Sequence, residues 1–170
     1  MVNGQVRAEA DGQRVAIPLR NFLIVTDCPA EWRRHDLYLL GDEEVAFYVG
    51  QSYNAFERVW EHLRGGFKGR SVVGRFVLSN WPRAMGFIVE LLHSGSPRFD
   101  PAGNTPEAAE RYLIEQLRPC FNEALNDRPT PLPARYARPD AKVRRPRSLK
   151  QMMREAEYAI RSENSGRPWE

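Results

Sequence analysis

Two short apolar segments on either side of an acidic turn constrain the fold of this chain most. Residues 37–40 and 45–51 are rich in leucine, valine and aromatic residues, and the turn sequence Gly-Asp-Glu-Glu occupies residues 41–44. This arrangement predicts a β-hairpin, because both segments have the length of strands and the residues between them favour a tight turn. Asn54 then begins a helix, which the glycines at 65–66 are expected to end. The sequence therefore predicts a hairpin that leads directly into a helix.

Further elements are predicted after this unit. Residues 71–79 have the β-branched and aromatic content of a third strand, and residues 83–93 predict a mostly buried helix. Thr105 with Pro106 begins another helix, which is expected to end before Pro119.

The two ends of the chain differ from its centre, so we divide it into three parts. Residues 1–35 are an N-terminal extension, residues 36–127 are the central domain and residues 128–170 are a C-terminal arm and helix. Within the extension, residues 15–17 and 22–25 predict short strands that pack on the domain as an extra layer.

The C-terminal part begins with an arm that contains five prolines between residues 128 and 147 and is expected to be extended. Ser148 with Gln151 begins a last helix, and Gly166 is expected to end it. The apolar stripe of this helix consists of Leu149, Met152, Met153, Ala156 and Ile160. Such a stripe can dock a partner or a second copy of the chain, so a homo-oligomer is one expectation.

Positive charge is concentrated in two regions. Residues 128–170 carry 11 Lys and Arg against 5 Asp and Glu, whereas residues 1–127 carry 14 against 17. Residues 63–89 contain five basic residues and no acidic one. Both regions suit a polyanion such as double-stranded DNA, although the same charges also suit an ordinary solvated surface. The candidate nucleic-acid-binding residues are Arg64, Lys68, Arg70, Arg75, Arg144, Arg145 and Arg147.

The composition excludes several classes of protein. A chain of 170 residues that is 42% hydrophobic can fold around a core of its own. It has no apolar run long enough to span a membrane, and its first ten residues lack the apolar part of a signal peptide. Cys28 and Cys120 form neither a disulfide framework nor a zinc cluster, so we expect a cytoplasmic protein.

Two polar residues lie off the apolar stripe of the helix that begins at Asn54. Arg58 and His62 are four residues apart, so both side chains are on one face of the helix. They are either part of a solvated polar face or an arginine for phosphate charge beside an imidazole that can exchange protons.

Glu110 is the acidic residue that does not fit its helix. Leu113, Ile114 and Leu117 follow it at helical spacing, so Glu110 lies where the stripe predicts a core residue. A carboxylate on a buried face is unfavourable unless it is paired or binds a metal, although near a helix start it can also extend toward solvent. Glu110 is therefore a candidate metal ligand.

Four more residues become informative when taken together with these. Tyr38 and Tyr48 lie in the two predicted hairpin strands, where strand pairing can bring both hydroxyls to one side of the sheet. Gly50 permits close approach to the backbone, for example by a phosphate, and Asn122 alone is typical of a turn.

Taken in chain order, these residues resemble the GIY-YIG nuclease superfamily. The two tripeptides of that name correspond to Asp36-Leu37-Tyr38 and Tyr48-Val49-Gly50, with two departures in the first and a conservative one in the second. An asparagine-containing segment then leads to a helical arginine and a histidine, here Arg58 and His62. The metal-binding segment of the family corresponds to Glu110, Leu113, Ile114, Pro119 and Asn122. The resemblance covers about residues 36–122.

The resemblance implies an α+β fold with a small antiparallel sheet of about three strands flanked by helices. It also implies an endonuclease that hydrolyses DNA phosphodiester bonds with a single Mg²⁺ or Mn²⁺ ion. Glu110 would hold the ion, Arg58 would neutralise charge on the phosphate, and a tyrosine would accept a proton from water. Tyr38 is the favoured base with Tyr48 orienting the water or phosphate, and the two could be reversed.

The same resemblance implies that His62 assists the tyrosine or orients the phosphate, and that Asn122 positions the glutamate or the phosphate backbone. Two alternatives stay open. The chain could be a module on the same scaffold that binds nucleic acid without cutting it, or a nuclease that acts on RNA or branched DNA.

Overall fold

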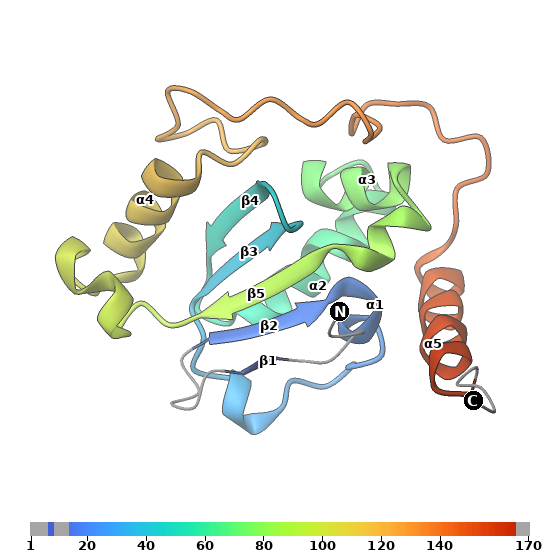
Figure 1. Cartoon of the computed structure of the whole chain (residues 1–170), viewed down its shortest axis with the longest axis horizontal. Helices are drawn as coiled ribbons and strands as arrows, with labels where there is room; N and C mark the ends of the chain where they lie inside the picture. The colour runs from blue at the N-terminus through green and yellow to red at the C-terminus, as the bar shows by residue number, and fades with distance from the viewer. Residues whose placement is uncertain (1–6, 9–13, 166–170) are drawn as a thin grey trace, which may run out of the picture.

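The computed structural model describes residues 7–8 and 14–165, which form an α+β fold built on one antiparallel sheet (Figure 1). The strands are β1 (Arg7–Ala8), β2 (Arg14–Pro18), β3 (Leu37–Gly41), β4 (Ala46–Gln51) and β5 (Ile88–Leu92), in the order β1-β2-β5-β3-β4. The helices are α1 (Leu19–Phe22), α2 (Ala55–Phe67), α3 (Val72–Ser79), α4 (Pro106–Leu117) and α5 (Leu149–Ser165), with 3-10 helices η1 (Ala30–Trp32), η2 (Arg83–Gly86) and η3 (Pro97–Ala102). The expected α+β class is confirmed.

The predicted hairpin is present as β3 and β4. Tyr38 pairs with Gly50 and Leu40 with Tyr48, so the side chains of both tyrosines lie on the same face of the sheet. The turn forms because the Asp42 carboxylate accepts hydrogen bonds from two backbone N–H groups of the turn, at 2.7 and 2.8 Å. A local sequence signal therefore predicts this part of the fold correctly.

The helix after the hairpin also begins where the sequence predicts. The Asn54 side chain accepts a hydrogen bond of 3.2 Å from the backbone N–H of Glu57, as expected of a residue that caps a helix. The helix does not end at its glycines, however, but continues through Gly65 and Gly66 to Phe67. These glycines serve a close contact with the next helix, which is described below.

Two elements differ from their predictions. Residues 71–79 were expected to be a strand but form α3, because Ser71 caps a helix and the apolar residues after it are buried at helical spacing. Residues 83–93 were expected to be a helix but form η2 and then β5. β5 lies between β2 and β3, where helices cover both faces of the sheet, so its residues are apolar almost without interruption rather than in alternation.

The N-terminal extension contributes to the sheet itself. Residues 15–17 form a strand as predicted, but β2 pairs with β5 over its whole length instead of forming an extra layer. Residues 22–25, also expected to be a strand, are the end of α1 and the turn after it. The sheet is therefore larger than the three strands implied by the resemblance.

Helices cover both faces of the sheet. On one face, the side chains of α1, α2, α3 and α5 pack with Tyr38, Leu40 and other sheet residues around a cluster of aromatic rings. On the other face, α4 packs through Leu113 and Ile114 on Leu37, Leu39 and their neighbours. The hairpin strands thus lie between the helix that carries His62 and the helix that carries Glu110.

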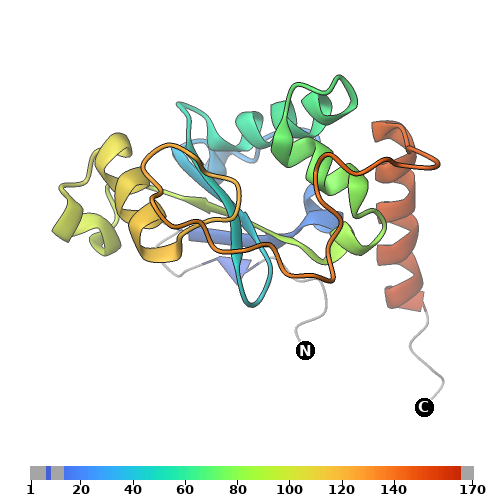
Figure 2. The same ribbon diagram turned by 90° about the horizontal axis from the view of Figure 1, so that it is seen from above.

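The C-terminal arm spans the distance between α4 and α5, which lie at opposite ends of the molecule (Figures 1 and 2). It contains neither helix nor strand in the described residues from 118 to 148, as predicted for an extended segment. Several hydrogen bonds connect the arm to α3 and to the residue that ends this helix. The Asn80 amide donates to the carbonyl of Ala137 and accepts from its N–H, at 2.9 and 2.8 Å, and Arg75 donates to the Pro139 carbonyl at 3.0 Å.

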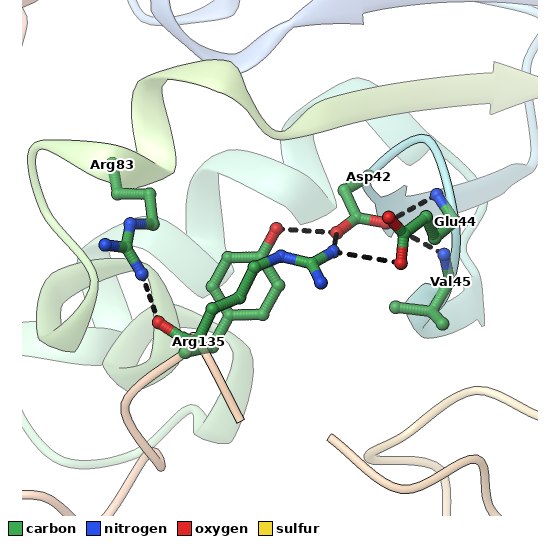
Figure 3. Close-up of polar contacts among 6 residues, drawn as sticks. Asp42, Glu44, Val45, Arg83 and Arg135 are labelled. Carbon is green, nitrogen blue, oxygen red and sulfur yellow. Dashed lines mark hydrogen bonds and ion pairs between the residues drawn. The ribbon is translucent and has the colours of Figure 1, made fainter. Parts of the chain in front are cut away.

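The arm also forms polar contacts with the hairpin turn, which Figure 3 shows. Asp42 accepts hydrogen bonds from the Tyr136 hydroxyl at 2.6 Å and from Arg135 at 2.9 Å, and Arg83 donates to the Arg135 carbonyl. The Tyr136 ring packs edge-on against three phenylalanine rings of the core. The arm is therefore part of the packed structure.

The apolar stripe of helix α5 packs against the core of the same chain. Met152 and Ala156 are fully buried, and Trp81 donates a hydrogen bond of 2.8 Å to Glu155. The expected end of this helix at Gly166 lies outside the described residues. None of the helices in the described part of the chain has both the length and the apolarity needed to cross a membrane.

Candidate functional site

Three aromatic residues predicted for the site meet on one face of the hairpin. The Tyr38 hydroxyl is 2.8 Å from His62 Nε2, which places a hydrogen bond between β3 and α2. The Tyr48 ring lies 6.1 Å from the Tyr38 ring and 5.5 Å from the imidazole, measured between ring centroids. Residues that are 24 positions apart in the chain thus form one compact group.

Gly50 allows this group to form. It lies directly opposite Tyr38, and a Cβ atom on Gly50 would be 2.3 Å from the Tyr38 hydroxyl. The close approach that the sequence suggested for a phosphate is therefore made here by the Tyr38 ring. A side chain at position 50 would displace the hydroxyl that bonds to His62.

Gly50→Ala is expected to reduce the free energy of unfolding by about 1–3 kcal/mol, the usual effect of overpacking, and to break the Tyr38–His62 hydrogen bond. The check is a double-mutant cycle with Tyr38→Ala, followed by chemical denaturation. In the Tyr38→Ala background the same glycine substitution should have little effect, because the ring that it contacts is gone. Equal effects in both backgrounds would contradict this account of Gly50.

His62 has a second partner that the sequence reasoning missed. Its Nδ1 is 2.7 Å from the Ser71 hydroxyl, which also accepts a hydrogen bond of 3.0 Å from the Gly74 backbone N–H. The signal was available, since a serine before a helix is a typical cap, but it was hidden by the prediction of a strand over residues 71–79.

Two glycines bring Ser71 to the histidine. A Cβ atom on Gly66 would lie 2.5 Å from the backbone of Gly74, and one on Gly74 would lie 2.0 Å from the backbone carbonyl oxygen of His62. Helices α2 and α3 therefore cross with their backbones in contact. This crossing places the first residue of α3 beside the imidazole on α2.

Burial keeps both partners of the Tyr38–His62 hydrogen bond neutral in this structure. It raises the pKa of the Tyr38 phenol, and the neighbouring Tyr48 raises it further, while the Arg58 guanidinium lowers it. Burial, with the positive charge of Arg58, lowers the pKa of His62 to about 4. At neutral pH the pair is a phenol and an uncharged imidazole.

Arg58 lies next to this group, at the surface of the protein. Its guanidinium interacts with the Tyr38 hydroxyl and forms an ion pair of 2.7 Å with Glu61, one turn further along α2. About half of the side chain is exposed, at 48%. Arg58 can therefore contact an anion from solvent while it remains next to the tyrosine.

Glu110 is half-buried on α4, on the other side of the hairpin strands. Its carboxylate has a hydrogen bond with the Gln51 side chain at the end of β4. Burial raises the pKa of Glu110, and the negative charge of Glu110 in turn helps to raise the pKa of Tyr38. The two residues are thus close enough to sense each other's charge.

The Glu110 carboxylate suits a hard cation. Among the ion pairs of the described residues none involves Glu110, so this half-buried acid has no cationic side chain to neutralise it. No group of three or more metal-ligating side chains occurs in the described part of the chain. Mg²⁺ commonly takes one or two carboxylates and keeps several waters, so Glu110 fits it as a single protein ligand.

Asn122 does not face this group. Its side-chain oxygen accepts a hydrogen bond of 2.9 Å from the Val49 N–H, and its amide donates one of 2.8 Å to the Val49 carbonyl. Both polar atoms of the buried side chain are therefore used by the β4 backbone. In this structure Asn122 connects the segment after α4 to β4, and its expected role in positioning the glutamate or a phosphate stays a prediction.

The predicted nucleic-acid-binding residues fall into three places. Arg64, Lys68 and Arg70 line an open groove of about 370 Å³ together with Arg58, Glu61, His62, Gly65 and Ser71. Arg75 is engaged by the arm. Arg145 and Arg147 line a separate hollow beside α5, and Arg144 is exposed next to them.

The site thus combines a basic groove, a buried tyrosine–histidine pair and an acid without a cationic partner. Comparisons of the chain with protein-family models, with curated proteins and with solved structures found no match.

Proposed function

We propose that the protein is a metal-dependent endonuclease that hydrolyses phosphodiester bonds of double-stranded DNA. The observation that carries the proposal is the hydrogen bond between Tyr38 and His62 at the wall of a basic groove. Ordinary surface charge does not account for this pair, because both side chains are largely buried and connect two elements. The resemblance to the GIY-YIG superfamily in the order of these residues supports the same reading.

In the proposed reaction, a phosphate enters the groove and contacts Arg58. The arginine then leaves Glu61 and neutralises the negative charge that develops on the phosphate oxygens. Arg64, Lys68 and Arg70 hold the neighbouring phosphates through charge alone, without reading the sequence of bases.

Tyr38 is the proposed general base and Tyr48 orients the attacking water. Tyr38 is only 4% exposed, so in this proposal Arg58 must move toward the substrate before the Tyr38 hydroxyl can contact the attacking water. Burial raises the pKa of Tyr38, so the phenol needs a nearby acceptor for its proton before it can act as a base, and in this proposal that acceptor is His62 Nε2, 2.8 Å away. The Mg²⁺ or Mn²⁺ ion held by Glu110 would supply Lewis-acid stabilisation of the leaving oxygen.

The test is incubation of the purified protein with supercoiled plasmid and Mg²⁺ or Mn²⁺, with EDTA as the control. We expect nicked and linear products with either metal and none with EDTA. Parallel reactions with RNA and with branched DNA distinguish the substrate classes. Specific binding of DNA without any cleavage under all metal conditions would instead support a non-cleaving module on the same scaffold.

Arg58→Ala is expected to reduce the cleavage rate by about 10²-fold or more, the usual effect of removing a group that stabilises charge in the transition state. Arg161→Ala is the matched control, because Arg161 also forms an exposed ion pair with a glutamate on its own helix, at 2.6 Å. The control variant should cleave at the wild-type rate. Equal rates for both variants would remove Arg58 from the mechanism.

A further inference from the structure

Tyr53 is the most exposed large apolar side chain of the described residues, and it lies in the short segment that joins β4 to α2. Its exposed fraction is 100%, compared with 74% for Tyr158 on α5. Among the described residues, its side chain forms no hydrogen bond and no ring contact. Because an exposed ring gains no free energy from burial, the packing of the fold does not account for an aromatic residue at this position.

The backbone on both sides of Tyr53 is held in place. The Ser52 N–H donates a hydrogen bond of 2.9 Å to the Asp36 carbonyl, and the Ala55 N–H donates one of 3.1 Å to the His35 carbonyl. The attachment of the side chain is therefore fixed although the ring itself is free. Such a ring is a preorganised contact surface, because little backbone freedom is lost when a partner binds to it.

The start of α2 shows that the ring has no role in ending or beginning the helix. Asn54 is the capping residue, so Tyr53 precedes the cap and Arg58 is the fourth residue of the helix. An apolar residue before the cap often packs on the fourth helical residue and fixes the direction of the chain. Here the described residues show no contact of the Tyr53 ring with the Arg58 guanidinium. The ring is thus available to a partner outside the chain.

The segment that carries Tyr53 lies between two groups of the proposed active site. Gln51, at the end of β4, has a hydrogen bond with the Glu110 carboxylate, and Arg58 lies near the start of α2. In the proposed reaction, the cleaved phosphate contacts both the ion on Glu110 and the Arg58 guanidinium. Residues 52–54 connect these two groups, so they border the bound phosphate.

Within this segment, Tyr53 has the side chain that is free to contact DNA. The Ser52 side chain is half-buried, and its hydroxyl accepts a hydrogen bond of 3.3 Å from the Asn54 N–H. The Asn54 side chain is half-buried as well and accepts from the Glu57 N–H. The flat face of the tyrosine ring is therefore the surface that this segment presents to a substrate.

An aromatic face suits a base rather than a phosphate. Aromatic side chains bind the faces of bases by stacking, and proteins that hold unpaired nucleotides use this contact widely. The cations of the groove bind the phosphates of any DNA through charge, so they do not distinguish one DNA structure from another. Tyr53 adds a kind of contact that the groove lacks.

We propose that Tyr53 is a substrate-contact residue whose ring stacks on a base next to the cleaved phosphate. The faces of the bases are covered by their neighbours in an intact duplex, so this contact requires a base that is unpaired or unstacked. The preferred substrate is therefore a DNA duplex with an unstacked base at the site of cleavage. The inference rests on the proposed function for that location, whereas the contact itself is measurable without cleavage.

The experiment uses the full-length protein and two fluorescently labelled duplexes, which differ only in one extra unpaired adenine at the centre of one strand. EDTA prevents cleavage, and fluorescence anisotropy measures the affinity. We expect the wild-type protein to bind the bulged duplex on the order of 10-fold more tightly than the perfect duplex, the usual effect of stacking one base on an aromatic ring. Tyr53→Ala should lose this preference and keep the affinity for the perfect duplex, whereas Tyr53→Trp should keep both.

Tyr158→Ala is the matched control, because it removes the other mostly exposed tyrosine, which lies on α5. It should keep the wild-type preference. A second readout places 2-aminopurine at the unpaired position, since stacking on an aromatic ring quenches its fluorescence. Quenching should follow binding of the wild-type protein and of Tyr158→Ala, but not of Tyr53→Ala. Because the Tyr53 ring is fully exposed, its removal is expected to leave the fold intact.

The outcomes separate this inference from the proposed function. Equal affinity of the wild-type protein for the two duplexes overturns the role of Tyr53, and so does a preference that Tyr53→Ala retains, whether or not the protein cuts DNA. Plasmid cleavage together with equal affinities supports the nuclease and removes the base contact. A preference that is lost in Tyr53→Ala, without cleavage by the wild-type protein when Mg²⁺ or Mn²⁺ is added, supports the contact and contradicts the nuclease.

Discussion

Replacement of Glu110 by glutamine is expected to eliminate metal-dependent cleavage, with a loss of rate on the order of 10³-fold or more, because several kcal/mol of transition-state stabilisation depend on the bound ion. Glutamine keeps the shape of the side chain and can still bond to Gln51, but it lacks the charge that attracts a cation. The measurement is plasmid cleavage over a range of Mg²⁺ and Mn²⁺ concentrations. A high metal concentration should not restore the rate.

The stability of this variant is expected to be unchanged or higher at neutral pH. Burial raises the pKa of Glu110 in the folded state, so the contribution of this group to stability is fully present below its unfolded pKa and is lost as pH rises through the folded pKa. At neutral pH the ionised carboxylate is therefore unfavourable, and glutamine removes that effect. Thermal unfolding at acidic and neutral pH measures the difference.

Glu115→Gln is the matched control, because Glu115 is an exposed acid on the same helix. It should leave both the rate and the metal dependence unchanged. If Glu110→Gln cleaved as fast as this control, Glu110 could not be the metal ligand and the proposed mechanism would be wrong.

Gly74→Ala is expected to have the largest effect on stability, a decrease of about 3 kcal/mol or more in the free energy of unfolding, at the upper end of overpacking effects. The new methyl group would lie 2.0 Å from the backbone carbonyl oxygen of His62 and 2.7 Å from Gly66. Backbone atoms cannot rotate away as a flexible side chain can, so α2 and α3 must separate. Chemical denaturation measures the loss.

Gly86→Ala is the control for this substitution, since a Cβ atom at Gly86 has no atom within 4 Å. It should change the free energy of unfolding by less than about 1 kcal/mol, as glycine substitutions do at compatible positions. The Gly74 variant should also lose the contact between Ser71 and His62, so its cleavage rate should fall even where the protein stays folded. Similar stabilities for the two variants would show that the helix crossing is not tight.

Elements with strong local signals could be predicted from the sequence. The hairpin follows from its turn, where the Asp42 side chain bonds to the backbone, and α2 and α4 begin at Asn54 and Thr105, whose side chains accept hydrogen bonds from the backbone of the first turn. Each of these signals acts within four residues. They can therefore be recognised without knowing how the rest of the chain folds.

The predictions failed for two short, mostly apolar segments whose composition suits either a strand or a helix. Periodicity alone does not distinguish the two in so short a run, so α3 and β5 were exchanged in type. The cap at Ser71 distinguishes the two, because it begins a helix whatever the apolar pattern that follows. The error also concealed Ser71 as a neighbour of His62.

The candidate site was predictable in part for the same reason. Tyr38 and Tyr48 are paired by the hairpin, and His62 follows from a helix that begins at a predictable residue. The use of Asn122 could not be foreseen, because it depends on where the chain passes after α4 rather than on its own surroundings in sequence. Its backbone neighbours at 120 and 121 bond to β4 as well.

The attachment of the arm at Asp42 limits where the chain can be truncated without disturbing the hairpin. The turn that joins the two tyrosine-bearing strands is bonded to Arg135 and Tyr136, and the Tyr136 ring closes one side of the aromatic core. A chain shortened at residue 127 would lose both, so we expect the hairpin and the last quarter of the sequence to unfold as a single cooperative unit. A truncation that removes the arm is therefore expected to loosen the hairpin that carries Tyr38 and Tyr48 as well.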